Sequence, residues 1–323
     1  MGCKTDDLSV LQVVVQLIIC IKLITSQSST TLRLVEKDAT VVGLEPFYNE
    51  TTFSSTECYL ACLQQIDRCF YIETENLNEA WTCKLYNFLA EDIKKYLKPA
   101  KGREIVSPYP KKYPKDCVDL KQMGFEKDGV YSISIRENES PRKVFCDMAT
   151  DGGGWIVIQK RFDGSVDFNR NWTDYRNGFG NIDVNGEYWL DNEFVHQYTS
   201  MYETNLILEA VTFGGEKNTT KLQSFKLSDE VSKYIFEFGT CEGLCSLALN
   251  KRKFSTPDQD NDASIKHCAA MFGAWWHKNC FWVNFNGKYS NTNPVPHWTG
   301  ITWKEFRGSA ESLKETKMMV RRI

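Results

Sequence analysis

An acidic run near the C-terminal end of the chain carries the residues best suited to bind a ligand. Asp258, Asp260 and Asp262 alternate within the segment PDQDNDASIKHC. Ionised carboxylates crowded on a short loop repel one another unless a cation lies between them, and hard oxygen ligands suit Ca²⁺. The segment is not an EF-hand loop, because its sixth position is Ala263 rather than Gly and its twelfth is Ala269 rather than Glu. Without further context, the run also fits a simple solvated loop.

Other chemistry finds little support in the sequence. The chain contains no G-x-S-x-G, H-E-x-x-H or P-loop motif, and none of its four His lies in a recognisable triad context. The formal net charge of −3 lacks the basic surface that nucleic-acid binding requires. We therefore expect a protein that is not an enzyme and has no nucleic-acid partner.

The N-terminus indicates the compartment. The apolar run from Leu8 to Ile24 is followed by TSQSST, which predicts a signal peptide over residues 1–26. Gln12, Gln16 and Lys22 interrupt the run and argue against stable spanning, but its length leaves an uncleaved, membrane-attached signal anchor as the alternative. Either interpretation places the rest of the chain outside the cytosol, and we expect a secreted, extracellular protein.

The cysteines and sequons agree with secretion. Of twelve cysteines, Cys3 and Cys20 lie in the predicted signal, which leaves an even number of ten for disulfides. Cys241 and Cys245 favour a local bridge across Gly243, with an intermolecular bond as the alternative. N-x-S/T sequons predict a glycoprotein modified at Asn49, Asn138, Asn171 and Asn218.

The chain is expected to contain two folded parts joined by a linker. Residues 98–115 are rich in Pro and Lys and lack apolar periodicity, which predicts the linker. Four of the ten cysteines precede it and six follow, so each side can close its own bridges. No collagen repeat or long heptad run is present, so a homo-oligomer would have to form by other means.

Residues 116–323 resemble the fibrinogen C-terminal domain family along their whole length. The ordered motifs are DCVDLKQMGFEKDGVY, VFCDMATDGGGWIVIQKRFDGSVDF, GEYWLDNEF, FSTPDQDND, CAAMFGAWWHKNC, GITWKEFRG and MMVRRI. Gly152–Gly154 predicts a turn that only Gly tolerates easily, and WIVIQKRF predicts a β-strand. The expected fold is α+β, with a twisted antiparallel sheet, short helices and a loop-rich C-terminal region.

The resemblance gives the acidic run a specific role. The family's calcium loop places Asp260 and Asp262 as side-chain ligands, with the backbone carbonyls of Ser264 and Lys266 completing the site. Lys266 stands where the family usually has Gly or another small residue, so the affinity for Ca²⁺ is expected to be weakened.

Two disulfides follow from the same resemblance, namely Cys117–Cys146 and Cys268–Cys280. The second competes with a zinc site formed by His267-Cys268 and His277-x2-Cys280. An oxidising compartment and the family's pairing favour the disulfide.

The ligand pocket of the family's lectin-like members is expected beside the calcium loop. It depends on a cis peptide bond, which would be Asn279–Cys280 here. The remaining pocket positions have changed from those of acetyl-group binders, because they carry the more apolar residues Met271, Phe281, His297 and Trp298. Recognition of N-acetyl groups is therefore in doubt, and a hydrophobic or protein ligand gains support.

Residues 30–97 resemble a PAN/apple-like module. SSTECYLACLQQIDRC predicts a capped helix with Cys58 and Cys62 on one face, and CFYIETE and WTCKLYNFL predict strands. The resemblance implies the bridges Cys58–Cys83 and Cys62–Cys69, which so small a module would need.

Two functions compete. The first is a calcium-dependent, lectin-like recognition protein of innate defence that binds carbohydrate or microbial surface groups beside the calcium loop. The alternative is an extracellular-matrix or receptor-ligand protein that binds a protein partner through the same domain. The altered pocket favours the alternative, whereas the lack of a matrix-type repeat array favours the lectin.

Overall fold

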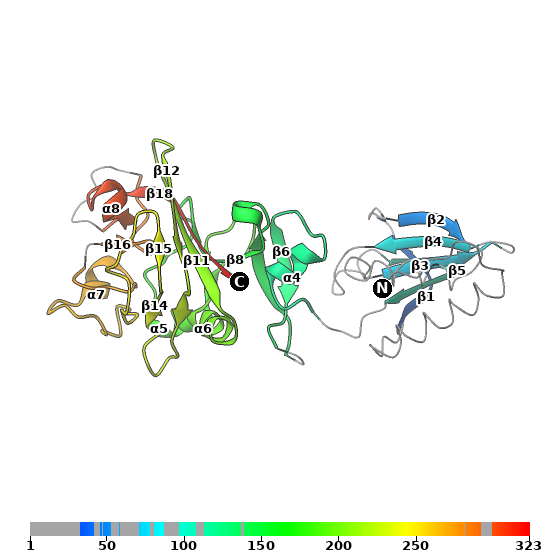
Figure 1. Cartoon of the computed structure of the whole chain (residues 1–323), viewed down its shortest axis with the longest axis horizontal. Helices are drawn as coiled ribbons and strands as arrows, with labels where there is room; N and C mark the ends of the chain where they lie inside the picture. Colours follow the sequence, from blue (N-terminus) through cyan, green and yellow to red (C-terminus); the bar gives the residue numbers. More distant parts are fainter. Residues whose placement is uncertain are drawn as a thin grey trace, which may run out of the picture. The chain divides into compact units, whose positions relative to one another are not determined.

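The computed structural model describes residues 33–41, 46, 48–52, 58, 71–77, 81–86, 97–107, 113–136, 139–280, 282–291 and 299–323. The chain divides into two compact units, Met1–Tyr113 and Pro114–Ile323, which are drawn in Figure 1. The predicted signal peptide and the predicted Cys62–Cys69 bridge lie outside the described residues. Within the described part of the chain, no helix is long and apolar enough to cross a membrane.

The N-terminal unit contains a five-stranded antiparallel sheet. Its strands are β1 (Arg33–Val41), β2 (Tyr48–Thr52), β3 (Tyr71–Asn76), β4 (Trp81–Tyr86) and β5 (Leu97–Ser107). They lie in the order β1-β5-β3-β4-β2. The strands β3 and β4 confirm the two predicted from the sequence, and the Cys58–Cys83 disulfide joins residue 58 to β4. The PAN/apple-like assignment stays a prediction.

The predicted linker over residues 98–115 is wrong for most of its length, because β5 belongs to the sheet. This strand pairs with β1 on one side and with β3 on the other. Its pairing with β3 begins only at Arg103, so Pro99 and its missing N–H lie outside that ladder. Arg103 also forms salt bridges with Glu73 and Glu75 of β3, at 3.1 and 3.0 Å. The basic and proline-rich composition therefore does not exclude a strand, and Arg103 of this strand is paired across the sheet.

The C-terminal unit is built on a nine-stranded antiparallel sheet. Seven strands lie in the order β15-β12-β11-β18-β8-β10-β9, while β7 pairs with β8 and β6 pairs with β7. The members are β6 (Gly129–Ile133), β7 (Arg142–Asp147), β8 (Trp155–Arg161), β9 (Phe179–Gly180), β10 (Tyr188–Trp189), β11 (Thr204–Thr212), β12 (Lys217–Leu222), β15 (Cys241–Glu242) and β18 (Leu313–Arg322). The C-terminal strand β18 lies between β11 and β8, so the end of the chain completes the centre of the sheet.

The turn before β8 has the predicted glycine geometry. Gly152, Gly153 and Gly154 all have positive φ values, and a Cβ on Gly153 would lie 2.1 Å from the carbonyl oxygen of Met148. The short 3₁₀ helix η1 (Thr150–Gly152) precedes this turn. The predicted Cys117–Cys146 disulfide is present and joins the helix α4 (Cys117–Gln122) to β7.

Helices and aromatic rings form the core beside the sheet. The helices α5 (Trp172–Asn177) and α6 (Asn192–Met201) begin at the side-chain caps Asn171 and Asp191. Buried rings contributed by α5, β10 and later loops pack at centroid distances of 4.9 to 5.9 Å; examples are Tyr175, Trp189, Phe254 and Trp276. This ring cluster anchors the loop-rich segments on the sheet.

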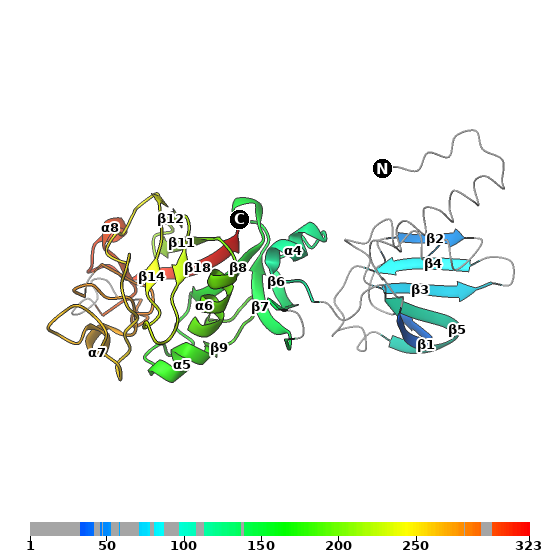
Figure 2. The same ribbon diagram turned by 60° about the horizontal axis from the view of Figure 1, so that its bottom comes forward.

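The remaining elements are short and joined by long loops. They are β13 (Lys226–Leu227), β14 (Phe236–Glu237), α7 (Cys268–Phe272), β16 (Val283–Asn284), β17 (Thr302–Trp303) and α8 (Lys304–Arg307). Figures 1 and 2 both show α7 and α8 at the end of this unit that lies away from α4 and β6. The α+β class, with few short helices and a loop-rich C-terminal region, is confirmed.

Candidate functional site

The acidic loop, residues 258–268, is coiled by hydrogen bonds from backbone amides to the side chains two residues earlier. Asp262 N–H donates to Asp260 Oδ1 at 3.2 Å, and Ser264 N–H donates to Asp262 Oδ1 at 2.8 Å. Lys266 N–H donates to Ser264 Oγ at 3.1 Å. Such turns compete with helix and strand hydrogen bonding, which is why these residues form a loop.

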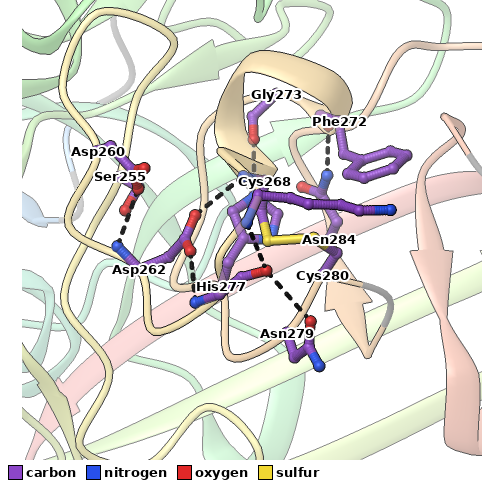
Figure 3. Close-up of a disulfide and its surroundings, with 12 residues drawn as sticks. Ser255, Asp260, Asp262, Cys268, Phe272, Gly273, His277, Asn279, Cys280 and Asn284 are labelled. Carbon is purple, nitrogen blue, oxygen red and sulfur yellow. Dashed lines mark hydrogen bonds between the residues drawn. A yellow bond between two sulfur atoms is a disulfide. The ribbon is translucent and has the colours of Figure 1, made fainter.

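Asp262 is the centre of this loop (Figure 3). Its Oδ2 accepts a hydrogen bond of 2.9 Å from the N–H of Cys268, the first residue of α7. Burial raises the pKa of Asp262 above its usual value, and the neighbouring Asp260 carboxylate raises it further. Among the salt bridges of the described residues, none involves Asp260 or Asp262. The two carboxylates therefore crowd together without a basic side chain to balance them.

The chemistry of these donors fits a calcium ion. Two adjacent carboxylates supply hard oxygen ligands, and a bound cation would offset both the burial and the repulsion that raise the pKa of Asp262. Within the described segments, no three His, Cys, Asp or Glu side chains gather closely enough to hold a metal ion. A cation here would therefore need backbone oxygens as well, as the predicted roles of Ser264 and Lys266 require. Calcium binding stays a prediction.

Asp258 belongs to the same run but has a structural task. Its Oδ1 accepts the N–H of Trp172 at 2.9 Å and the hydroxyl of Thr256 at 2.7 Å. These bonds join the beginning of the acidic loop to the first residue of α5. Asp258 was not among the predicted ligands, and the structure accounts for it without a metal.

The Cys268–Cys280 disulfide closes the segment that follows the acidic loop. Because both sulfurs are bonded to each other, they are not available for the alternative zinc site. His267 Nε2 lies 3.0 Å from the carbonyl oxygen of Thr256, and His277 Nε2 lies 2.8 Å from that of Gly273. Burial lowers the pKa of His277 to about 4, so this ring is neutral at physiological pH.

The structure describes half of the predicted ligand pocket. Met271 is exposed on α7, Asn279 is exposed, and Cys280 is buried with φ +61°. The Asn279 Oδ1 accepts a hydrogen bond of 3.2 Å from Ser264 Oγ, which joins this edge to the acidic loop. Phe281, His297 and Trp298 lie outside the described residues. The pocket and the cis peptide bond stay predictions.

A basic and aromatic cluster beside the disulfide was missed from the sequence. The Lys304 ammonium lies 4.1 Å from the centroid of the Trp282 ring, and that of Lys278 lies 5.9 Å from it. Both lysines are exposed, and none of the salt bridges of the described residues includes them. Lys278 and Lys304 come from segments 26 residues apart, so no local spacing could have revealed the cluster.

The predicted glycosylation sites differ in accessibility. Asn49 and Asn171 are exposed. The Nδ2 atom of Asn218, to which a glycan would be attached, is buried and has no hydrogen-bond partner in the part of the chain that the structure describes. Modification of Asn218 would require its side chain to turn outward, so the structure does not favour that site. Asn138 lies outside the described residues.

Cys241 and Cys245 form the predicted local bridge. Gly243 between them has φ +103°, and a Cβ there would lie 2.9 Å from Thr219 O and Thr220 Oγ1. The tight turn therefore depends on glycine, and the alternative of an intermolecular bond is not what the structure contains.

Comparisons with known proteins identify relatives of the C-terminal unit. Angiopoietin-1 from Bos taurus is 41% identical over 213 residues, which cover 64% of this chain and 42% of the relative. Angiopoietin-4 from Mus musculus is 41% identical over 218 residues, which cover 66% and 42%. The chain thus spans less than half the length of these relatives.

Solved structures give the same assignment. The fibrinogen-like globe domain of human ANGPTL6 superposes with a TM-score of 0.61 at 35% identity, covering 65% of this chain and 96% of that domain. Lamprey fibrin D-dimer, described as complexed with the peptide ligand Gly-His-Arg-Pro-amide, has a TM-score of 0.59 at 29% identity, covering 65% and 74%. The family model "Fibrinogen beta and gamma chains, C-terminal globular domain" matches residues 113–323. The chain belongs to this fibrinogen C-terminal domain family.

Proposed function

We propose that this chain is a secreted, non-enzymatic ligand that binds an extracellular protein partner. The contact region is what we call the loop surface, which comprises Ile265, Met271, Lys278, Trp282 and Lys304. Ile265 carries the proposal, because its side chain is completely exposed, at 103%. An aliphatic side chain held in water on a loop ordered by four hydrogen bonds is suited to enter a pocket of a partner protein.

The rest of the loop surface has the composition of a protein-binding site. Met271 is 44% exposed on α7, and methionine adapts its shape to a partner at low cost. Trp282 is half-buried beside two lysines that have no carboxylate partner in the described structure. Aromatic and apolar anchors surrounded by a charged rim are typical of interfaces between proteins.

The relatives also support a protein partner over a carbohydrate. The similar proteins are angiopoietins and an angiopoietin-like globe domain, and the lamprey fibrin structure holds a peptide. None of these three descriptions names a carbohydrate. The changed acetyl-binding positions agree with this preference, and the comparisons therefore favour the receptor-ligand interpretation over the lectin.

Calcium would act on this surface indirectly. The carboxylates of Asp260 and Asp262, with the carbonyls of Ser264 and Lys266, would hold the ion, which supplies positive charge and rigidity to the loop. Ile265 lies between these last two residues in the chain, so ordering of the loop would fix the position of the exposed side chain.

The test screens the secreted protein against displayed extracellular protein domains and against a glycan array, each with Ca²⁺ and with chelator. We expect binding to at least one protein domain, and we expect Ile265→Asp to abolish it. Val231→Asp is the matched control, because Val231 is another exposed aliphatic residue, at 87%, between β13 and β14. Binding to glycans alone, or equal binding by both variants, would refute the proposal.

A further inference from the structure

Three short segments of the C-terminal unit, all of which precede the acidic loop in the chain, bring several lysines together. Lys226 of β13 pairs with Glu237 of β14. On the other side of β14, Phe236 forms a bridge with Arg252, and Lys251 N–H donates to Phe236 O at 2.8 Å. The run Lys251-Arg252-Lys253 therefore continues the small sheet of β13 and β14 as a third segment.

The lysines of this region are exposed and carry unbalanced charge. Lys226, Lys251 and Lys253, which we call the lysine patch, are all exposed, and none takes part in any salt bridge of the described residues. Glu237 is the single acidic residue among the paired positions of the three segments. The whole chain has a net charge of −3, so this is a local concentration of positive charge on an acidic protein.

The chemistry of the patch differs from that of the loop surface. The large apolar residues in these segments, namely Leu227, Phe236 and Phe254, are buried at 0 to 2% exposure. A protein interface would normally include aromatic or apolar anchors, and none of these three is exposed, whereas the exposed Val231 lies in the loop between β13 and β14. Lysine ammonium groups act as point charges that bind anionic oxygens without the fixed geometry that arginine requires. The patch is thus suited to a partner whose binding is almost wholly electrostatic.

We propose that the lysine patch binds a sulfated glycosaminoglycan. Lys251 and Lys253 are the chain neighbours of Arg252, which forms the bridge to Phe236 of β14. Lys226 lies across β14 from them and widens the patch to a third segment. A linear polymer that carries many sulfates can contact several lysines at once, so weak single contacts add up to useful affinity.

This site would hold the protein on the extracellular polysaccharide while the loop surface remains free for a protein partner. The proposal rests on different residues from the proposed function, and each can fail without the other. Because the ion pairs would be exposed, binding should weaken steeply as salt is added.

The test measures binding of the full secreted chain to immobilised heparin. We expect Lys226→Gln/Lys251→Gln/Lys253→Gln to bind about tenfold more weakly than the unsubstituted protein and to elute at lower salt. The matched control is Lys127→Gln/Lys143→Gln/Lys288→Gln, which removes the same charge from three exposed lysines outside both the lysine patch and the loop surface. It should retain heparin binding within about twofold.

Two further probes identify the anion. Desulfated heparin should not be retained, and polyglutamate should compete poorly with heparin. Equal loss in the two triple variants, undiminished binding of the patch variant, or equal binding of polyglutamate would each overturn the proposal. Unchanged melting temperatures of both variants would show that they are folded, as expected for exposed positions.

Discussion

Two loops of the C-terminal unit are each organised by one carboxylate, and they differ in what balances its charge. Glu187 Oε1 accepts N–H groups from Phe162, Asp163 and Gly164 at 2.7 to 3.0 Å, and its other oxygen lies 3.6 Å from Arg161 Nε. Asp262 accepts two N–H groups but faces Asp260 instead of a basic residue.

The difference separates a structural carboxylate from one with capacity to bind an ion. Glu187 and Arg161 are both almost completely buried, at 0% and 1% side-chain exposure, and each supplies the opposite charge that the other needs. Asp262 is half-buried in an exposed loop, and the charged neighbour that acts on its pKa, Asp260, has the same sign. Similar local hydrogen bonding therefore occurs at two different kinds of site. The carboxylate of Glu187 is neutralised by Arg161, which we call the closed site, whereas that of Asp262 has no such partner, which we call the open site.

The largest effect is expected at the closed site. Glu187→Gln should lower the free energy of unfolding by about 3–5 kcal/mol, because it leaves the Arg161 charge buried without a partner. Urea unfolding monitored by fluorescence measures this change. Glu139→Gln, which removes an exposed carboxylate paired with Arg136, is the control and should change it by less than about 1 kcal/mol. A loss at position 187 no larger than the control would contradict the structural role.

Acid should destabilise the loop-rich end of the C-terminal unit, which contains His277 and the acidic loop, more than the loop held by Glu187. Burial lowers the pKa of His277 from 6.5 to about 4. Below pH 6.5 the unfolded chain therefore takes up a proton that the folded chain refuses. Stability contributed by the neutral ring is lost as the pH falls from 6.5 towards 4, by up to about 3 kcal/mol.

His277→Gln should flatten this part of the pH profile, which thermal unfolding between pH 7 and pH 4 would reveal. His196→Gln is the control, since His196 is half-buried on α6 and its Nδ1 lies 2.9 Å from Leu227 O. A melting temperature of the unsubstituted protein that stays constant between pH 6.5 and 4 would rule out a buried neutral imidazole at His277.

Calcium should distinguish the carboxylate of Asp262 from that of Glu187. If Asp260 and Asp262 hold the ion, free Ca²⁺ at 100 times its dissociation constant should stabilise the protein by about 2.7 kcal/mol. Differential scanning calorimetry with Ca²⁺ and with chelator measures this. Asp262→Asn should lose the response, whereas Glu187→Gln should keep it despite its lower stability. If the melting temperature of the unsubstituted protein changes neither with Ca²⁺ nor with chelator, a structural calcium site is excluded.

The sequence was most informative where structure depends on local geometry or on paired cysteines. The positive φ values of Gly152–Gly154 and the strand β8 follow directly from residue type. Four of the five predicted disulfides are present in the structure, and the fifth lies outside the described residues.

Features that depend on distant partners could not be predicted in the same way. Arg161 and Glu187 are 26 residues apart, and Trp282 meets Lys304 only after the chain has folded. The strand β5 could not be predicted from its basic composition, because Arg103 finds its partners Glu73 and Glu75 on another strand. The acidic run illustrates both cases, since its ligand-like spacing was evident but the separate task of Asp258 was not.

The smallest expected effect distinguishes Asp258 from Asp260 within the acidic run. Asp258→Ala removes the hydrogen bonds to Trp172 N–H and Thr256 Oγ1, and should lower the free energy of unfolding by about 1 kcal/mol while leaving the calcium response intact. Asp260→Asn should remove the calcium response and leave the free energy of unfolding nearly unchanged. Its carboxylate is exposed and accepts one 3.2 Å bond from Asp262 N–H. Urea unfolding with and without Ca²⁺ measures both variants. Loss of the calcium response in Asp258→Ala would move this residue from the structural group to the ion-binding group.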